Sequence, residues 1–115
     1  MVTFAQVREM ALALPEVTQG PSWGTTSFKV RNKLFVRQHE DGESVVVKVA
    51  PDEREALVAE RPDTFVVTPH YEPYPLMLVR MARIDMDEMH EIVVEAWRMV
   101  APKRLAAAYD RGEHR

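Results

Sequence analysis

The chain has 115 residues, of which 46% are hydrophobic and 29% charged, and its formal net charge at pH 7 is -3. This length and composition predict one soluble globular domain over residues 1–115. The absence of cysteine excludes disulfides, thiolate zinc sites and a cysteine nucleophile. The acidic balance argues against a general nucleic-acid binder, which usually carries a basic excess.

No apolar run approaches the roughly 20 residues that span a bilayer. The first ten residues lack the basic lead and the continuous apolar segment of a signal peptide. We therefore expect a cytoplasmic protein without a membrane partner.

A first helix is predicted over residues 4–13. Thr3 and Gln6 fit a capping box, in which each side chain satisfies a free backbone N–H of the first turn. Pro15 ends the helix, because the residue before a proline is pushed out of the helical region. Apolar residues recur at helical spacing through this segment: Phe4, Val7, Met10 or Ala11, and Leu14.

Three strands are expected after this helix. Residues 17–24 contain glycine and proline breakers and predict an irregular loop. Residues 27–31 alternate polar and apolar, and Asn32 suits a tight turn, so residues 27–31 and 33–38 are predicted to form a hairpin. An Asp-Gly turn then leads into the valine-rich strand at residues 44–49.

The second half of the chain is predicted to alternate helices and strands. Pro51 begins a helix that ends near residue 60, before Pro62. Strands at residues 64–68 and 76–81 flank a connection rich in proline and tyrosine at residues 69–75.

The strongest helical signature follows Asp85, which fits an N-cap. A short helix over residues 103–109 is expected after Pro102. The apolar stripe of the long helix recurs at helical spacing: Met89, Ile92, Val93, Ala96, Trp97 and Val100. The predicted fold is therefore α+β, a two-layer α/β domain with an antiparallel five-stranded sheet, in the order α-β(3)-α-β(2)-α plus a short C-terminal helix.

A basic hairpin is the most distinctive candidate site. Residues 25–38 contain no acidic residue and four basic ones: Lys29, Arg31, Lys33 and Arg37. A two-stranded ribbon with a cationic face can enter the major groove of DNA. Alternatively, these charges line the exposed face of a half-buried sheet and discourage edge pairing.

Three aromatic residues are candidates for a surface site: Trp23, Tyr71 and Tyr74. Core packing is the alternative for Trp23. An enzymatic reading requires a pocket that gathers these rings with a histidine. The four histidines lie in different elements and form no zinc-binding spacing, and the hydroxyls of residues 22–27 lack a glycine elbow. We therefore expect no catalytic residue, metal or cofactor.

Several short motifs together resemble the MmcQ/YjbR family: Ala-Leu-Pro-Glu-Val-Thr at residues 13–18, Trp23-Gly24, Ser-Phe-Lys-Val at 27–30, Asn-Lys-Leu-Phe at 32–35 and Ala-Trp-Arg-Met-Val-Ala-Pro-Lys-Arg-Leu at 96–105. Asn32 departs from the glycine that is common in this turn, but asparagine tolerates the same backbone conformation. The resemblance implies a two-layer fold of the secretion-chaperone-like kind. The family is commonly labelled DNA-binding and has no established catalytic residues.

The expected function is that of a small cytoplasmic binding protein and not of an enzyme. DNA is the first expected partner, bound through the basic hairpin with support from Lys103 and Arg104. The alternative is a protein-interaction or chaperone-like module that binds no nucleic acid, suggested by the fold resemblance and by the connection at residues 69–75. Either a monomer or a homodimer is compatible with the sequence.

Overall fold

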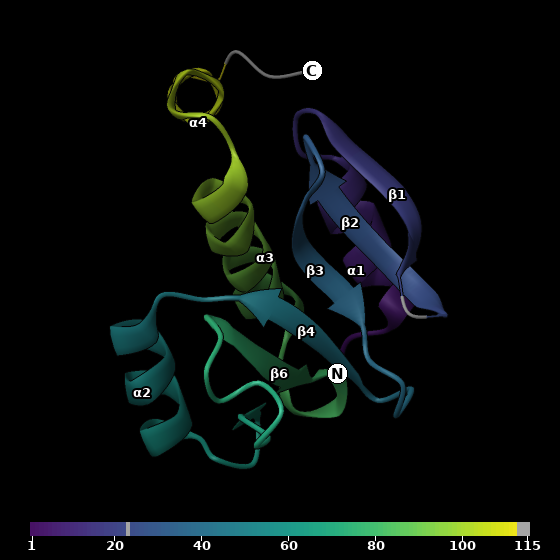
Figure 1. Ribbon diagram of the computed structural model, residues 1–115, viewed down its shortest axis with the longest axis vertical. Helices are drawn as coiled ribbons and strands as arrows, with labels where there is room; N and C mark the ends of the chain where they lie inside the picture. The colour runs from purple at the N-terminus through teal and green to yellow at the C-terminus, as the bar shows by residue number, and fades with distance from the viewer. Residues whose placement is uncertain (23, 113–115) are drawn as a thin grey trace.

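A six-stranded antiparallel sheet forms the centre of the molecule, as the computed structural model shows for residues 1–22 and 24–112 (Figure 1). The helices are α1 (Phe4–Leu12), α2 (Pro51–Glu60), α3 (Met86–Val100) and α4 (Lys103–Asp110), with a short 3-10 helix, η1 (Met81–Arg83). The strands are β1 (Val17–Ser22), β2 (Thr25–Val30), β3 (Lys33–Gln38), β4 (Ser44–Lys48), β5 (Phe65–Val66) and β6 (Leu76–Arg80). They lie in the spatial order β1-β2-β3-β4-β6-β5.

Strand β1 corrects the predicted five-stranded sheet. Residues 17–22 were expected in a loop, yet they pair with β2 from Val17 opposite Val30 to Ser22 opposite Thr25. Gly20 and Pro21 weaken the local preference for a strand, but β1 lies at the edge of the sheet, where both residues are tolerated. The pairing with β2 outweighs Gly20 and Pro21, whereas the prediction took only these local breakers into account.

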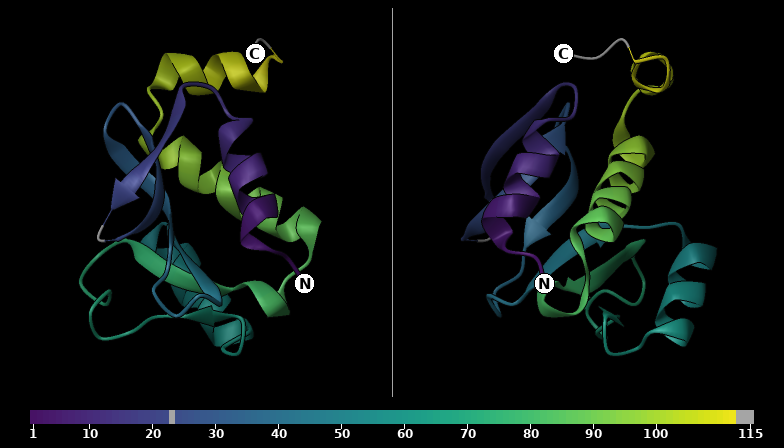
Figure 2. Two further views of the ribbon diagram at one scale, coloured as in Figure 1. Left: turned by 90° about the vertical axis from the view of Figure 1, so that its right-hand side faces the viewer. Right: turned by 180° about the vertical axis from the view of Figure 1, so that it is seen from behind.

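The helices follow the prediction closely. The Thr3 and Gln6 capping box is present, with the Gln6 amide donating to Thr3 Oγ1 at 3.2 Å and the Thr3 amide donating to Gln6 Oε1 at 2.9 Å. Figure 2 shows α1 and α3 on the same face of the sheet. In the part of the chain that the structure describes, no helix is both long enough and apolar enough to span a membrane.

The main core lies between the sheet and helices α1 and α3. Trp97 of α3 is fully buried there, and its Nε1 donates to the carbonyl of Pro15 at 3.1 Å, which ties α3 to the turn after α1. Tyr109 packs against Trp97, with ring centroids 5.1 Å apart, and holds α4 to the end of α3. The buried side chains of α3 are Met89, Val93, Val94, Ala96, Trp97 and Val100.

A register shift in the hairpin of β2 and β3 decides which side chains face the core. Phe28 pairs with Val36, whereas Lys29 pairs with Leu34, so Phe35 is an extra residue in β3. Phe35 and Val36 both join the main core, although adjacent strand residues normally point to opposite faces. Arg37 therefore follows Val36 on the opposite, outer face, opposite Val46 of β4.

A smaller apolar cluster covers the outer face of the sheet. Tyr71, from the connection between β5 and β6, packs there against Val46 and Leu78. Val66 and Leu76 extend the cluster as partly buried neighbours. The outer face is therefore stabilised by its own apolar cluster, separate from the main core beneath α1 and α3.

Candidate functional site

The candidate site is a cleft on the outer face of the sheet, with a volume of about 690 Å³. We call it the outer cleft. Its walls come from β3, from the turn after β3, from β4 and from the connection between β5 and β6. Three aliphatic side chains, those of Leu34, Val46 and Leu76, contribute apolar surface to it. A volume in this range is typical of small-ligand sites, which lie between about 300 and 1,000 Å³.

Arg37 forms the polar base of the outer cleft. Its side chain is only 7% exposed, and Nη1 donates to Glu40 Oε1 at 2.7 Å, to Thr25 Oγ1 at 3.0 Å and to the Gln38 carbonyl at 3.2 Å. Nη2 donates to the hydroxyl of Tyr71. Because a buried charge is tolerated only when it is paired and hydrogen-bonded, these contacts are what allow an arginine at this position.

Glu40 is the counterion of Arg37 at the mouth of the cleft. The hydrogen bond from Arg37 holds the pKa of the Glu40 carboxyl below its usual value. Glu40 is therefore ionised at neutral pH, and its charge offsets that of Arg37. The pair contributes no net charge to the outer cleft.

Four rings surround the apolar part of the cleft: His39, His70, Tyr71 and Tyr74. Tyr71 is buried, and the ring of His70 meets it edge to face with centroids 4.8 Å apart. His39 meets Tyr71 from another side, at 6.4 Å between centroids. Tyr74 is 53% exposed. Tyr71 is therefore held in place, whereas His70 and Tyr74 are exposed and accessible to a ligand.

Arg54 of α2 holds the connection that carries three of these rings. Its Nη1 donates to the carbonyls of Tyr74 at 2.7 Å, Leu76 at 3.1 Å and Tyr71 at 3.3 Å, and its Nη2 donates to the carbonyl of Glu72 at 3.1 Å. One guanidinium therefore donates to four backbone carbonyls of this connection, in addition to the backbone hydrogen bonds that the connection makes within itself. These hydrogen bonds from Arg54 fix the position of the connection relative to α2.

The residues of the predicted basic hairpin do not form one cationic face. Arg31 pairs with Glu16, with Nε 3.0 Å from Oε1, and this hydrogen bond raises the pKa of Arg31. Arg37 is buried in the outer cleft, so its expected place on an exposed face was wrong. Lys29 is partly exposed on the outer face, and Lys33 is exposed near the turn. The register shift places Arg37 on the same outer face as Lys29, but there Arg37 is buried and bonded to Glu40 and Tyr71.

The other sequence candidates are dispersed. Lys103 and Arg104 are exposed in the first turn of α4. Tyr71 is buried and not at the surface as expected, whereas Tyr74 lies exposed at the outer cleft. Trp23 lies outside the residues that the structure describes.

Sequence reasoning did not find four residues of the site: His39, Glu40, His70 and Arg54. His39 and Glu40 follow a strand and precede an Asp-Gly turn, which is a place where binding residues often lie. His70 stands beside Tyr71 in the connection already singled out. Nothing in the local sequence of α2 indicates that Arg54 contacts a loop 17 to 22 positions away.

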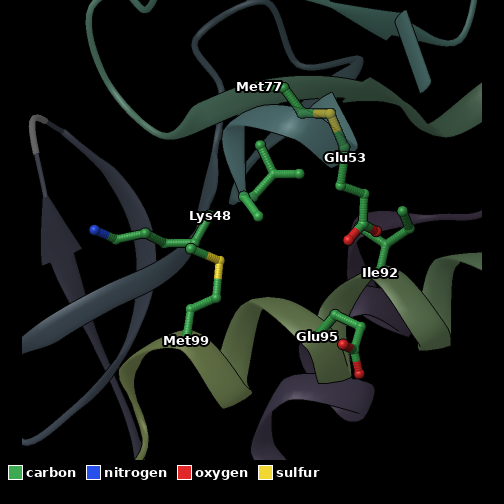
Figure 3. Close-up of a pocket in the computed structure, with 8 residues that line it drawn as sticks. Lys48, Glu53, Met77, Ile92, Glu95 and Met99 are labelled. Carbon is green, nitrogen blue, oxygen red and sulfur yellow. The ribbon is translucent and has the colours of Figure 1, made fainter. Parts of the chain in front are cut away.

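A second crevice lies between α2, α3 and the sheet (Figure 3). Figure 3 shows Met77 of β6 and Ile92 and Met99 of α3 around it, with Glu53 of α2 and Glu95 of α3 nearby. Its volume of about 90 Å³ is below the range of ligand sites. Across residues 1–22 and 24–112, no three histidine, aspartate or glutamate side chains are grouped to hold a metal ion.

Part of this chain is similar to curated mycobacterial proteins. An uncharacterized protein of Mycobacterium bovis, Mb2600, and one of Mycobacterium tuberculosis, Rv2570, are each 41% identical over 69 residues, which is 59% of this chain and 54% of each relative. The chain thus spans about half the length of these relatives.

A crystal structure of the Deinococcus radiodurans protein DR2400, described with the domain DUF419, has the same fold. Its TM-score is 0.78 at 18% identity, over 98% of this chain and 88% of that one. The model of the YjbR family matches residues 12–99. This chain therefore belongs to the YjbR family.

Proposed function

We propose that this protein binds a small molecule in the outer cleft. The observation that carries the proposal is the composition of that cleft, in which aliphatic surface, accessible rings and a few polar groups meet in about 690 Å³. Concave, largely apolar sites with a small number of fixed polar groups are the usual form of ligand sites in proteins.

The construction of the cleft supports binding because its parts are held before a ligand arrives. Arg37 links the base of the cleft to Tyr71, and Arg54 fixes the backbone of the connection that carries Tyr71 and Tyr74. Affinity increases when a site does not have to order itself on binding. Two separate arginine contacts serve this purpose here.

The test is a screen of a small-molecule fragment set by two-dimensional NMR of the labelled protein. We expect hits to shift the resonances of residues 34–40 and 68–76 and to leave those of α1 unchanged. The Tyr74→Ala variant should weaken the binding of these hits. Met99→Ala, which removes another exposed apolar side chain outside the outer cleft, should not. Hits that all map elsewhere, or no hits at all, would exclude the proposal.

DNA binding is a second candidate function, supported by the positions of exposed basic side chains. The turn between β2 and β3 and the start of α4 lie at the same end of the molecule (Figures 1 and 2). Lys33, Lys103 and Arg104 are exposed there. This end carries few charges, so the binding would weaken steeply as salt increases.

Fluorescence titration with duplex and single-stranded DNA at two salt concentrations tests the second candidate. Binding that is lost in a Lys33→Ala, Lys103→Ala, Arg104→Ala triple variant supports it, whereas no binding at low salt rejects it. Arg31→Ala serves as a matched control, because that side chain is already paired with Glu16.

A protein-interaction or chaperone-like role stays a prediction. The connection at residues 69–75 that suggested it is exposed at Pro69, Glu72 and Pro73, but Arg54 ties its backbone to α2. Light scattering and a pull-down that show a stable complex in the absence of small molecules would favour this role over ligand binding.

A further inference from the structure

We infer that the outer cleft takes an uncharged, planar heteroaromatic ring and not an anion. This inference rests on the proposed function and names the chemical class of its ligand. Three properties of the described cleft support it: the balance of its charges, the accessibility of its rings and the kind of polar atoms beside them.

The charges of the cleft argue against an anionic ligand. Arg37 is the basic side chain that lines it, and its guanidinium is 7% exposed and directed at Glu40, Thr25 and Tyr71. To reach this guanidinium, a phosphate or carboxylate would have to displace Glu40, whose Oε1 lies 2.7 Å from Arg37 Nη1. It would also approach the negative charge of Glu40, whose side chain is 58% exposed at the mouth of the cleft. An anionic ligand beside Glu40 would be repelled by its carboxylate, so the pairing of Arg37 with Glu40 lowers the affinity of the cleft for anions.

A cationic ligand is disfavoured by the same pair. Glu40 already has its counterion in Arg37, and a ligand cation would have to compete with a guanidinium that is held by several other acceptors. Because the pair has no net charge, the remaining attraction of the cleft is apolar and hydrogen-bonding in nature.

The rings favour a planar ligand. Tyr74 and His70 are exposed, while Leu34 and Leu76 are partly exposed aliphatic surface in the same cleft. A flat ring can cover aliphatic side chains with one face and an aromatic side chain with the other. Because it is rigid, it loses less conformational entropy on binding than a flexible chain does. Tyr71, packed between the two histidines, keeps this arrangement in place.

The polar atoms favour nitrogen and oxygen at the edge of that ring. Thr68 offers a hydroxyl, and His70 offers an imidazole, which in its neutral form has one donor and one acceptor. His39 adds its Nε2, because its Nδ1 already accepts a hydrogen bond from the Asp41 amide at 3.3 Å. A ring whose edge carries both donors and acceptors can match these groups, whereas a hydrocarbon ring would leave them unpaired. A heteroaromatic ring is therefore the class that satisfies the apolar and the polar parts together.

Such a ring can come from a free small molecule or from an unstacked base of a single-stranded nucleic acid. The experiment uses adenosine, adenosine monophosphate, inorganic phosphate and a short single-stranded oligodeoxyadenylate as probes, each titrated into the labelled full chain and followed by NMR. Adenosine is expected to shift residues 68–76, and phosphate is expected to leave them unchanged. The dissociation constant of the monophosphate should lie within about twofold of that of adenosine.

Two variants test whether stacking is responsible. Tyr74→Ala should weaken adenosine roughly fivefold or more, the smaller end of what one base–aromatic stack contributes, while Tyr74→Phe keeps the ring and should bind within about twofold of the wild type. Adenosine that binds as tightly as the oligonucleotide indicates a free ring compound. An oligonucleotide that binds more tightly, and still depends on Tyr74, indicates the base of a strand.

The result that overturns the inference is a shift of the cleft resonances by phosphate, or a monophosphate that binds at least tenfold more tightly than adenosine. That result would leave the proposed small-ligand function standing, with an anion as the ligand. If no probe and no fragment shifts the outer cleft, both the inference and the proposed function are rejected.

Discussion

Nη2 of Arg37 donates a hydrogen bond to the hydroxyl of Tyr71, 34 positions further along the chain. This contact joins β3 to the connection between β5 and β6 and lies at the base of the outer cleft. The register shift at Phe35 places Arg37 on the outer face, and the contact with Tyr71 satisfies part of its buried guanidinium there. The shape of the outer cleft and the stability of the outer face therefore depend on the same pair.

Replacement of Arg37 by alanine should destabilise the protein by about 1–3 kcal/mol, because it leaves the buried Tyr71 hydroxyl without its partner. Chemical denaturation followed by circular dichroism measures the change. The matched control is Arg31→Ala, which removes a pair between exposed side chains and should cost between about 0 and 1 kcal/mol. Equal losses in the two variants would contradict the structural role of Arg37.

Replacement of Arg54 by glutamine should loosen the connection between β5 and β6 while the rest of the fold remains. The guanidinium is hydrogen-bonded to four carbonyls. A hydrogen bond to a charged group typically contributes about 1.5–3 kcal/mol to stability. Hydrogen exchange should become faster at residues 70–76 and stay unchanged in β1 and β2. Arg83→Gln, at an exposed arginine, is the control. Unchanged protection from hydrogen exchange at residues 70–76 in Arg54→Gln would show that Arg54 does not hold this connection.

Replacement of Trp97 by phenylalanine should destabilise the whole domain by about 2–4 kcal/mol. The change leaves a cavity in the main core and removes the donor to the buried Pro15 carbonyl. Thermal unfolding should show a single transition at a lower temperature. Met99→Ala, at an exposed position of the same helix, is the control and should shift the transition much less. An unchanged midpoint in Trp97→Phe would show that this contact does not support the core.

Asp41 should make stability depend on pH. Burial acts to raise its pKa, but the hydrogen bonds from the amides of Glu43 and Ser44, at 2.8 and 2.9 Å, prevail and the pKa lies below the ordinary value. A lowered pKa in the folded state gives stability that is present above the unfolded value of about 3.9 and is lost as pH falls through the folded value.

The measurement for Asp41 is the unfolding midpoint from pH 7 down to pH 3. Asp41→Asn should be less stable than the wild type at pH 7, and the gap between the two should narrow on acidification. Glu9→Gln, at an exposed position of α1, should follow the wild-type curve. A gap for Asp41→Asn that stays constant with pH would contradict this assignment.

The amino-acid sequence by itself determined the elements that depend on near neighbours. The capping box at Thr3 and Gln6, the apolar stripe of α3 and the valines of β4 are local patterns, and each forms the predicted element. Helix hydrogen bonds and caps connect residues three or four positions apart, so a short window of sequence contains the information they need. The family resemblance, carried by motifs spread along the chain, was confirmed by the match over residues 12–99.

Only the tertiary structure decided the sixth strand and the candidate site. Strand β1 forms because β2 offers partners to a segment with poor local preference, and the extra residue at Phe35 moves Arg37 to the outer face. Arg37 then meets Tyr71, and Arg54 meets the carbonyls of a distant connection. Strand register and side-chain partners across long separations depend on which segments pack together, and that choice belongs to the whole fold and not to any local pattern.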